Sequence, residues 1–253
     1  MKIITLDQGF QFGLGAFETI AVEQGKPIFL EKHLKRLERA ARYLGLGELK
    51  ERGITEQKIA SYLKEQDPEK LTHSAMKLML SEQNVIFQMR ENHYTEDQYE
   101  KGFTADFSKT RRNETSPLVS HKTMNYGDCI LEKRAAAKEG MDERIFLNTR
   151  GEIAEGTVSN LFFVRDGHLE TPKKSCGLLP GIMREYICET EKVHETVIYP
   201  DMLEQYEECF VTNSLMGIMP VKKLGEYSFE KRDRSDELRK KYLYFLKTKI
   251  VLK

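Results

Sequence analysis

The sequence predicts a mixed α and β (α+β) protein with two domains. Three observations support this prediction: the chain has 253 residues, short apolar runs alternate with stretches of helical periodicity, and a polar segment that ends in proline lies near its middle. A chain of this length buries a sizeable core. We expect a smaller N-terminal domain over residues 1–110, a linker over 111–118 and a larger C-terminal domain over 119–253.

The first half of the chain shows both kinds of pattern. Apolar runs of strand length cover residues 3–6, 17–22, 76–80 and 85–89. Helical periodicity is clearest over 31–44, where leucine and alanine recur on one face and Gly45 ends the pattern. A second helix is expected over 56–65, before the breaker Asp67-Pro68.

The second half begins with an expected strand over 103–107, after which residues 108–117 are polar and charged. Beyond that segment we expect helices over 126–138, 182–191 and 236–252. Strands are expected over 145–148, 160–164 and 208–211. No internal repeat is present, so these elements predict a single mixed architecture for the chain.

Composition excludes several classes of protein. Lys plus Arg and Asp plus Glu each number 40, so no basic field predicts nucleic-acid binding. The four cysteines form no CxxC pair and the six histidines have no metal-site spacing, which predicts reduced thiols and no metal. The first residues lack a long apolar run, and no run approaches membrane-spanning length. We therefore expect a soluble cytoplasmic protein.

Lys122 is the first residue with possible catalytic chemistry. It lies between the polar segment and an expected helix, in Ser120-His-Lys-Thr-Met-Asn-Tyr126. A lysine in this place is either a solvated surface charge or an amine held against a cofactor. In the second case desolvation lowers its pKa, so that the amine attacks an aldehyde and later moves protons.

Two later motifs supply partners for such an amine. Glu155 precedes Gly156 and an apolar strand, so we expect its carboxylate to point inward and to bind a pyridine nitrogen rather than lie in an exposed turn. In Leu179-Pro-Gly-Ile-Met-Arg184 the backbone N–H groups of Ile182 and Met183 begin a helix and can bind a phosphate, which the Ser214 hydroxyl completes. An amine, a carboxylate and a phosphate site together suit pyridoxal 5'-phosphate.

Other motifs carry less chemistry. Arg36 has a guanidinium that suits a phosphate, although periodicity alone makes it a surface residue of an amphipathic helix. The glycines of Phe12-Gly-Leu-Gly-Ala-Phe17 lack the third glycine of a dinucleotide fingerprint, and the chain has no Gly-x-x-x-x-Gly-Lys phosphate loop.

Six ordered motifs resemble those of the class IV (fold type IV) pyridoxal-phosphate aminotransferases, the family of branched-chain and D-amino-acid aminotransferases and aminodeoxychorismate lyase. They span nearly the whole chain: Phe12-Gly-Leu-Gly-Ala-Phe-Glu-Thr19, Lys32-His-Leu-Lys-Arg-Leu37, Lys122-Thr-Met-Asn125, Glu155-Gly-Thr-Val-Ser-Asn-Leu-Phe162, Leu179-Pro-Gly-Ile-Met-Arg184 and Thr212-Asn-Ser-Leu-Met-Gly-Ile-Met-Pro-Val221. The resemblance implies a small N-terminal α/β domain, a larger C-terminal pseudo-barrel domain and a homodimer.

The resemblance also implies roles for individual residues. Lys122 is then the Schiff-base lysine and Glu155 the partner of the pyridine nitrogen. The implied phosphate ligands are Arg36, the backbone of Ile182 and Met183, and Ser214. The implied substrate side is Phe17, Glu18 and Thr19. One departure is the short link Ser81-Glu-Gln-Asn84, where many members have a longer loop with a carboxylate-binding arginine; the expected substitutes are Arg90, Arg111 and Arg112.

Within the family, three features are similar to aminodeoxychorismate lyase: asparagine three residues after Lys122, the short chain and the loop around Asn213-Ser-Leu-Met216. The resemblance therefore implies a small-molecule amine substrate, 4-amino-4-deoxychorismate, which is converted to 4-aminobenzoate and pyruvate for folate biosynthesis. Two alternatives stay open. One is transamination of branched-chain or D-amino acids, and the other is a cofactor-free binding protein on the same fold.

Overall fold

The computed structural model describes residues 4–251, which divide into two compact units. Unit 1 runs to His93, takes in His121–Tyr126 and includes the chain from Leu246. Unit 2 comprises Tyr94–Ser120 and Gly127–Phe245. This division differs from the expected linker at 111–118, because residues 103–112 form one continuous strand inside the sheet of unit 2.

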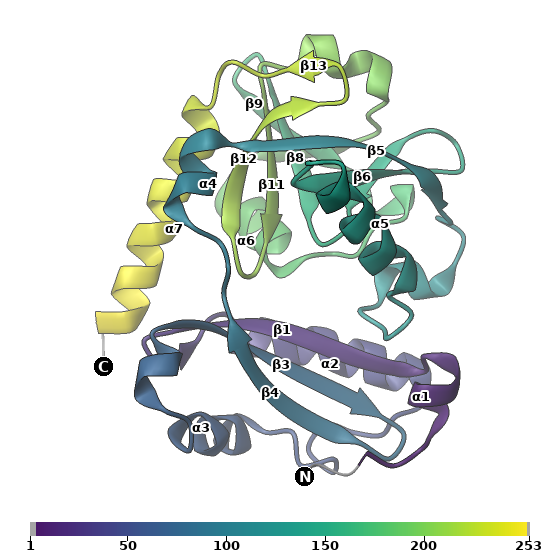
Figure 1. The fold of residues 1–253 in the computed structure, drawn as a ribbon, viewed down its shortest axis with the longest axis vertical. Helices are drawn as coiled ribbons and strands as arrows, with labels where there is room; N and C mark the ends of the chain where they lie inside the picture. The colour runs from purple at the N-terminus through teal and green to yellow at the C-terminus, as the bar shows by residue number, and fades with distance from the viewer. Residues whose placement is uncertain (1–3, 252–253) are drawn as a thin grey trace. The chain divides into compact units, whose positions relative to one another are not determined.

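Unit 1 is built on a four-stranded antiparallel sheet in the order β2-β1-β3-β4 (Figure 1). Its strands are β1 (Gly15–Glu23), β2 (Lys26–Pro27), β3 (His73–Ser81) and β4 (Val85–Glu91). Its helices are α1 (Gln8–Phe12), α2 (Leu30–Leu44) and α3 (Glu56–Lys64), followed by the 3₁₀ turn η1 (Pro68–Leu71). The strands predicted over 76–80 and 85–89, which lie within β3 and β4, and both longer helices are confirmed.

Local sequence explains the two longer helices of unit 1. On α2, Leu37, Ala40 and Ala41 are buried against apolar residues of β1 and β3, as the helical periodicity predicts. The helix ends where Gly45 adopts a left-handed φ of 68° and donates its N–H to carbonyls of the last turn. The α3 helix begins at Thr55, whose side chain accepts a hydrogen bond from the N–H of Lys58.

The expected strand over residues 3–6 is wrong for Ile4–Leu6, which adopt no regular structure, and Ile3 lies outside the described residues. The reason is a side chain that takes the place of a neighbouring strand. The Asn84 amide accepts from the N–H of Thr5 and donates to its carbonyl, both at 2.9 Å. Asp7 then begins α1 by accepting from the N–H of Phe10.

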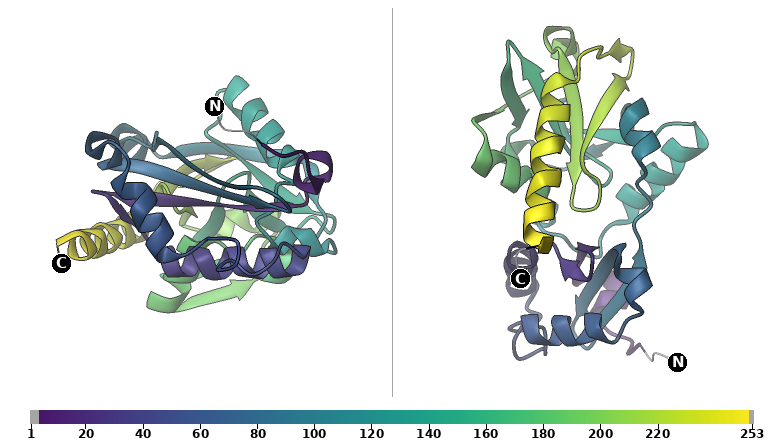
Figure 2. Two further views of the ribbon diagram at one scale, coloured as in Figure 1. Left: turned by 90° about the horizontal axis from the view of Figure 1, so that it is seen from below. Right: turned by 90° about the vertical axis from the view of Figure 1, so that its left-hand side faces the viewer.

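Unit 2 contains a nine-stranded mixed sheet in the order β10-β9-β8-β11-β12-β5-β6-β7, with β13 paired to β12. The strands are β5 (Phe103–Arg112), β6 (Glu143–Asn148), β7 (Ile153–Gly156), β8 (Asn160–Arg165), β9 (His168–Pro172), β10 (Val193–Thr196), β11 (Glu208–Asn213), β12 (Gly217–Leu224) and β13 (Tyr227–Ser228). Figure 2 shows the sheet of this unit from two further directions. Its parallel pairs join β10 to β9, β12 to β5 and β5 to β6.

The helices of unit 2 are α4 (Glu96–Lys101), α5 (Gly127–Lys138), α6 (Ile182–Thr190) and α7 (Asp233–Val251), the last of which ends among residues assigned to unit 1. Short 3₁₀ turns are η2 (Pro117–Ser120), η3 (Lys174–Cys176) and η4 (Pro200–Gln205). The predicted helices correspond to α5, α6 and α7, and the predicted strands to β5, β6, β8 and β11. Residue 252, where the last helix was expected to end, lies outside the described residues.

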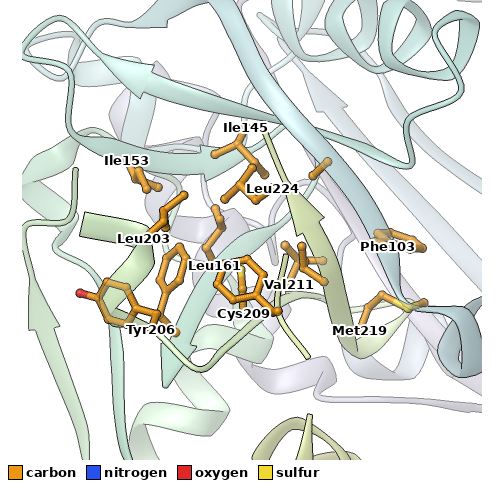
Figure 3. Packing of buried hydrophobic residues seen from close by; sticks show 14 of the residues in the cluster. Phe103, Ile145, Ile153, Leu161, Leu203, Tyr206, Cys209, Val211, Met219 and Leu224 are labelled. Atoms are coloured by element: carbon orange, nitrogen blue, oxygen red, sulfur yellow. The ribbon is translucent and has the colours of Figure 1, made fainter. Parts of the chain in front are cut away.

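The core of unit 2 lies against its central strands (Figure 3). Ile145, Leu161 and Val211 come from three different strands and are fully buried together. These strands read as continuous apolar runs because both faces of the sheet are covered there. The polar residues at the ends of the same strands lie outside this cluster.

Candidate active site

Lys122 is held on unit 1 by backbone pairing with the start of β1. The N–H of Phe17 donates to the carbonyl of Lys122 at 3.0 Å, and the N–H of Met124 donates to that of Gly15 at 2.8 Å. The Lys122 Nζ atom lies 4.6 Å from the centre of the Phe17 ring and 5.0 Å from that of Tyr126. Two aromatic rings thus flank a half-buried amine whose backbone is fixed by the sheet.

Gly13, which precedes β1, and Gly15, its first residue, lie close to the segment that contains Lys122. A β-carbon on Gly15 would lie 2.6 Å from the sulfur of Met124 and 2.9 Å from the carbonyl oxygen of Leu80. Gly13 has a φ of +71°, and its carbonyl accepts from the amide of Asn125 at 3.0 Å. This glycine-rich motif therefore seats the Lys-Thr-Met-Asn segment, which gives it a role other than nucleotide binding.

Phe17 and Thr19 share one face of β1 because alternate residues of a strand point to opposite faces. In the antiparallel pairing Thr19 lies opposite Lys77, whose Nζ atom is 4.8 Å from the centre of the Phe17 ring. Burial lowers the pKa of Lys77, and the positive charge of Arg90 on β4 lowers it further. Within residues 4–251 no carboxylate forms an ion pair with Lys77. This face is therefore cationic.

Glu18 lies on the opposite face, toward α2, which corrects its expected placement beside Phe17 and Thr19. Its carboxylate is fully buried and pairs with Arg36, whose Nε and Nη2 each donate at 2.7 Å. The Nδ1 atom of His33 lies 2.7 Å from the same carboxylate. Strand alternation is the physical reason for this change of side.

Two neighbouring basic side chains determine the pKa of the buried Glu18. Burial alone would raise the pKa of Glu18, but Arg36 and His33 together hold it far below its ordinary value. Burial lowers the pKa of His33 despite the attraction of Glu18. The Nδ1 atom of His33 and the guanidinium of Arg36 therefore both face the carboxylate of Glu18. Arg36 is buried, and two of its nitrogens bind Glu18.

Glu155 lies on β7 of unit 2, opposite Phe146 on β6, and its side chain is 6% exposed. One carboxylate oxygen accepts a hydrogen bond from the N–H of Leu179 at 3.0 Å. The other lies 2.6 Å from Nη2 of Arg112. The expectation that this carboxylate points inward is confirmed by its burial.

Asn160 connects the same motif to the start of α6. Its amide donates to the carbonyl of Leu179 at 2.9 Å and accepts from the N–H of Gly181 at 3.1 Å. A β-carbon on Gly181 would lie 2.1 Å from the amide oxygen, so only glycine fits. The beginning of α6 is therefore fixed by hydrogen bonds from β7 and β8 rather than by a capping side chain.

The start of α6 fits a phosphate group. The first N–H groups of a helix have no partner within the helix, and those of Ile182 and Met183 follow a glycine that offers no cap. Thr212 lies opposite Asn160 in the sheet, hence on the same face, and its buried hydroxyl has no hydrogen-bond partner among residues 4–251. Ser214 is half-buried in the turn after β11. These donors suit an anion such as a cofactor phosphate.

The predicted site residues divide between the two units. Unit 1 contains Phe17, Glu18, Thr19, Arg36, Arg90 and Lys122, and unit 2 contains Arg111, Arg112, Glu155, Ile182, Met183 and Ser214. Four further residues contact or neighbour the predicted ones and were not predicted: His33, Lys77, Asn160 and Thr212. The sequence indicates two of them, because Lys77 is a lone charge within an apolar strand and His33 precedes Arg36 by one helical turn.

Residues 4–251 contain neither a membrane-spanning helix nor a candidate metal cluster. No helix there combines the length and apolar character needed to cross a bilayer. No group of three or more His, Cys, Asp or Glu side chains there is placed to hold a metal ion.

Comparison with known proteins defines the family. The profile of amino-transferase class IV matches residues 15–224, so the chain belongs to this family. It is 26% identical over 245 residues to the aminodeoxychorismate lyase of Bacillus subtilis (strain 168), a match that covers 88% of this chain and 82% of the relative. It is 34% identical over 130 residues to the branched-chain-amino-acid aminotransferase of Escherichia coli (strain K12), which covers 49% of this chain and 42% of the relative.

Solved structures agree with this membership. A Legionella pneumophila protein provisionally assigned as a 4-amino-4-deoxychorismate lyase is 28% identical, with a TM-score of 0.84 over 96% of each chain. The 4-amino-4-deoxychorismate lyase of Pseudomonas aeruginosa has the same fold, with a TM-score of 0.82 at 24% identity. The predicted fold type IV architecture is confirmed. Class IV aminotransferases are pyridoxal 5'-phosphate enzymes, and the chain is an enzyme of this class.

Proposed function

We propose that this chain is a lyase that converts 4-amino-4-deoxychorismate to 4-aminobenzoate and pyruvate, a step of folate biosynthesis. The observation that carries the proposal is the extent of the likeness. Similarity to the Bacillus subtilis lyase runs through 88% of the chain and hence through both units, whereas similarity to the Escherichia coli branched-chain aminotransferase covers 49%. The Lys-x-x-Asn spacing from Lys122 to Asn125 supports the same assignment.

Lys122 would hold the aldehyde carbon of the cofactor covalently, and Glu155 would pair with the pyridine nitrogen of the cofactor. Its phosphate is assigned to the N–H groups of Ile182 and Met183, the hydroxyl of Ser214 and the guanidinium of Arg36. When bound, pyridoxal phosphate supplies an electron sink for the bonds broken at the amine-bearing carbon of the substrate.

Lys122 moves the proton in this proposal. Its released amine takes the proton from the amine-bearing ring carbon of the substrate. The neighbouring carbon–oxygen bond then breaks, and the leaving group departs as the enolate of pyruvate. Lys122 delivers the proton to the methylene carbon of that enolate, which gives pyruvate, while the ring becomes the aromatic 4-aminobenzoate. Glu155, kept ionised, favours a protonated pyridine nitrogen throughout.

The substrate carboxylates are assigned to the cationic face of unit 1. Lys77 and Arg90 lie on the same face as Phe17, and burial and the positive charge of Arg90 lower the pKa of Lys77. A bound carboxylate would supply the missing negative charge. The other two expected substitutes, Arg111 and Arg112, lie on β5 of unit 2, where Arg112 pairs with Glu155.

We also propose a cytoplasmic homodimer. Its support is an exposed apolar group at the start of the described chain, which a second copy would cover. The members are Ile4, Leu6, Phe10 and Phe12, each at least 59% exposed. Sedimentation of the purified chain tests this part of the proposal.

Transamination is the alternative within the family, and the 34% identity to the Escherichia coli branched-chain aminotransferase favours it. The two reactions share the step in which Lys122 removes a proton and differ in the atom that receives it. In transamination the proton goes to the cofactor carbon and a keto acid leaves.

A product assay separates the two. Purified protein with pyridoxal phosphate is incubated with 4-amino-4-deoxychorismate, and 4-aminobenzoate and pyruvate are measured. In parallel it is incubated with branched-chain or D-amino acids plus 2-oxoglutarate. We expect equal amounts of 4-aminobenzoate and pyruvate in the first arm. Keto acid that depends on 2-oxoglutarate, without 4-aminobenzoate, would reject the lyase assignment.

A further inference from the structure

Arg112, at the end of β5, has its guanidinium enclosed by three groups of unit 2. Its Nη2 lies 2.6 Å from a carboxylate oxygen of Glu155 and donates to the sulfur of Cys129 at 3.1 Å. Its central carbon lies 4.6 Å from the centre of the Phe146 ring. Only 19% of the side chain is exposed. The cation is therefore directed into the unit, unlike a ligand that awaits a substrate.

The sheet order explains how Arg112 reaches Glu155. The two residues lie on β5 and β7, which are separated by β6. On β6, Phe146 is the register partner of Glu155, so the guanidinium crosses the intervening strand over the Phe146 ring. The second oxygen of Glu155 accepts from the N–H of Leu179 at 3.0 Å. Both oxygens thus have partners within unit 2.

A buried carboxylate needs such a partner. Removing an isolated carboxylate from water is strongly unfavourable, and a buried group of this kind takes up a proton unless a cation pairs with it. Arginine is suited to this task because its guanidinium stays protonated and its planar fork restricts the carboxylate. Burial lowers the pKa of Arg112, but Glu155 and Cys129 raise it above its ordinary value.

We propose that Arg112 is a positioning residue that keeps Glu155 ionised and oriented for the pyridine nitrogen of the cofactor, rather than a ligand of the substrate carboxylate. This inference rests on the proposed function, because it assigns a task to the same Glu155. It accounts for a charged residue inside the segment that the sequence predicts as a solvated linker.

The first test uses the apoprotein and requires no activity. Arg112→Met leaves a buried carboxylate without its cation, so the melting temperature should fall by several degrees, whereas the neighbouring Arg111→Met, at an exposed residue, should leave it unchanged. Adding Glu155→Gln to Arg112→Met removes the stranded charge and should restore more than half of the loss. The inference is overturned if Arg112→Met behaves like Arg111→Met, or if the two substitutions add.

The second test uses the holoenzyme and separates positioning from substrate binding. Arg112→Met should lower kcat at least tenfold with less than a threefold change in KM, and should shift the visible absorption maximum of the bound cofactor. Arg112→Lys keeps the charge and should give an intermediate kcat. Arg112→Lys also tests the inference if Arg112→Met does not fold. A rise in KM with kcat and the absorption unchanged would assign Arg112 to the substrate and overturn the inference.

The outcome of the first test does not depend on the proposed function, because that test requires no activity. Absence of 4-aminobenzoate from the wild-type reaction would reject the lyase, while the apoprotein melting temperatures would still decide whether Arg112 and Glu155 are coupled.

Discussion

Replacing Glu18 with glutamine should destabilise unit 1 more than any exposed charge change in it. Glu18 is fully buried, and its oxygens accept two hydrogen bonds from Arg36 and one from His33, each 2.7 Å long. Glutamine keeps the shape but removes the negative charge, so the buried guanidinium loses its counter-ion. Breaking one partner of a buried pair costs about 3–5 kcal/mol.

This loss corresponds to a fall in melting temperature of about 10 °C for a chain of this size. Urea unfolding of the apoprotein, followed by far-UV circular dichroism, measures the change in the free energy of unfolding. The matched control is Glu31→Gln on α2, where the side chain is 73% exposed and pairs with Lys35 across one turn. That control should leave the free energy of unfolding nearly unchanged, because solvent screens an exposed pair.

The pH dependence of the Glu18 effect has a definite sign. Because the folded-state pKa of Glu18 lies far below the ordinary value of 4.5, its ionisation stabilises the fold above that value and the contribution is lost as pH falls below it. The difference between wild type and Glu18→Gln should therefore be full at neutral pH and shrink below about pH 4.5. A loss under about 1 kcal/mol at neutral pH, or a difference that grows on acidification, would refute the reasoning.

Three further predictions concern the site. Lys122→Ala should abolish 4-aminobenzoate formation while the free energy of unfolding changes by less than about 1 kcal/mol, which is the range of cation–π contacts such as those of its amine with Phe17 and Tyr126. Gly181→Ala should weaken pyridoxal-phosphate binding at least tenfold in a titration of the apoprotein, because a β-carbon there would lie 2.1 Å from the amide oxygen of Asn160. The control Gly127→Ala, where nothing lies within 4 Å of the added carbon, should bind the cofactor as the wild type does. Lys77→Met should raise KM about tenfold, which corresponds to about 1.4 kcal/mol, and should leave kcat unchanged. The control Lys58→Met, at an exposed residue, should change neither KM nor kcat.

The sequence predicts elements whose apolar pattern matches their burial. The run from Leu161 to Val164 is buried and forms β8, and the periodicity of residues 31–44 corresponds to α2. Short β7 and β10 lack such a pattern and were missed. The strand expected at Ile4–Leu6 fails because its backbone pairs with the Asn84 side chain, which hydropathy does not reveal.

Site residues were predictable when a motif specified a backbone position. Gly181 precedes a helix start, and Glu155 precedes an apolar strand, so both could be placed from local sequence. The partners of charged side chains were not predictable, because they come from distant strands. In the sequence, Arg112 belongs to a polar segment that predicts a solvated linker. In the fold, β5, β6 and β7 are neighbours in one sheet, which places Glu155 beside it.

The account depends most on Lys122 as the residue that holds the cofactor. Borohydride treatment of the holoprotein fixes the cofactor to the lysine that bears it, and digestion with mass spectrometry locates the label. We predict the label on residue 122, and none on Lys77, the other lysine beside the Phe17 ring. A label on another residue, or no label at all, would contradict the account.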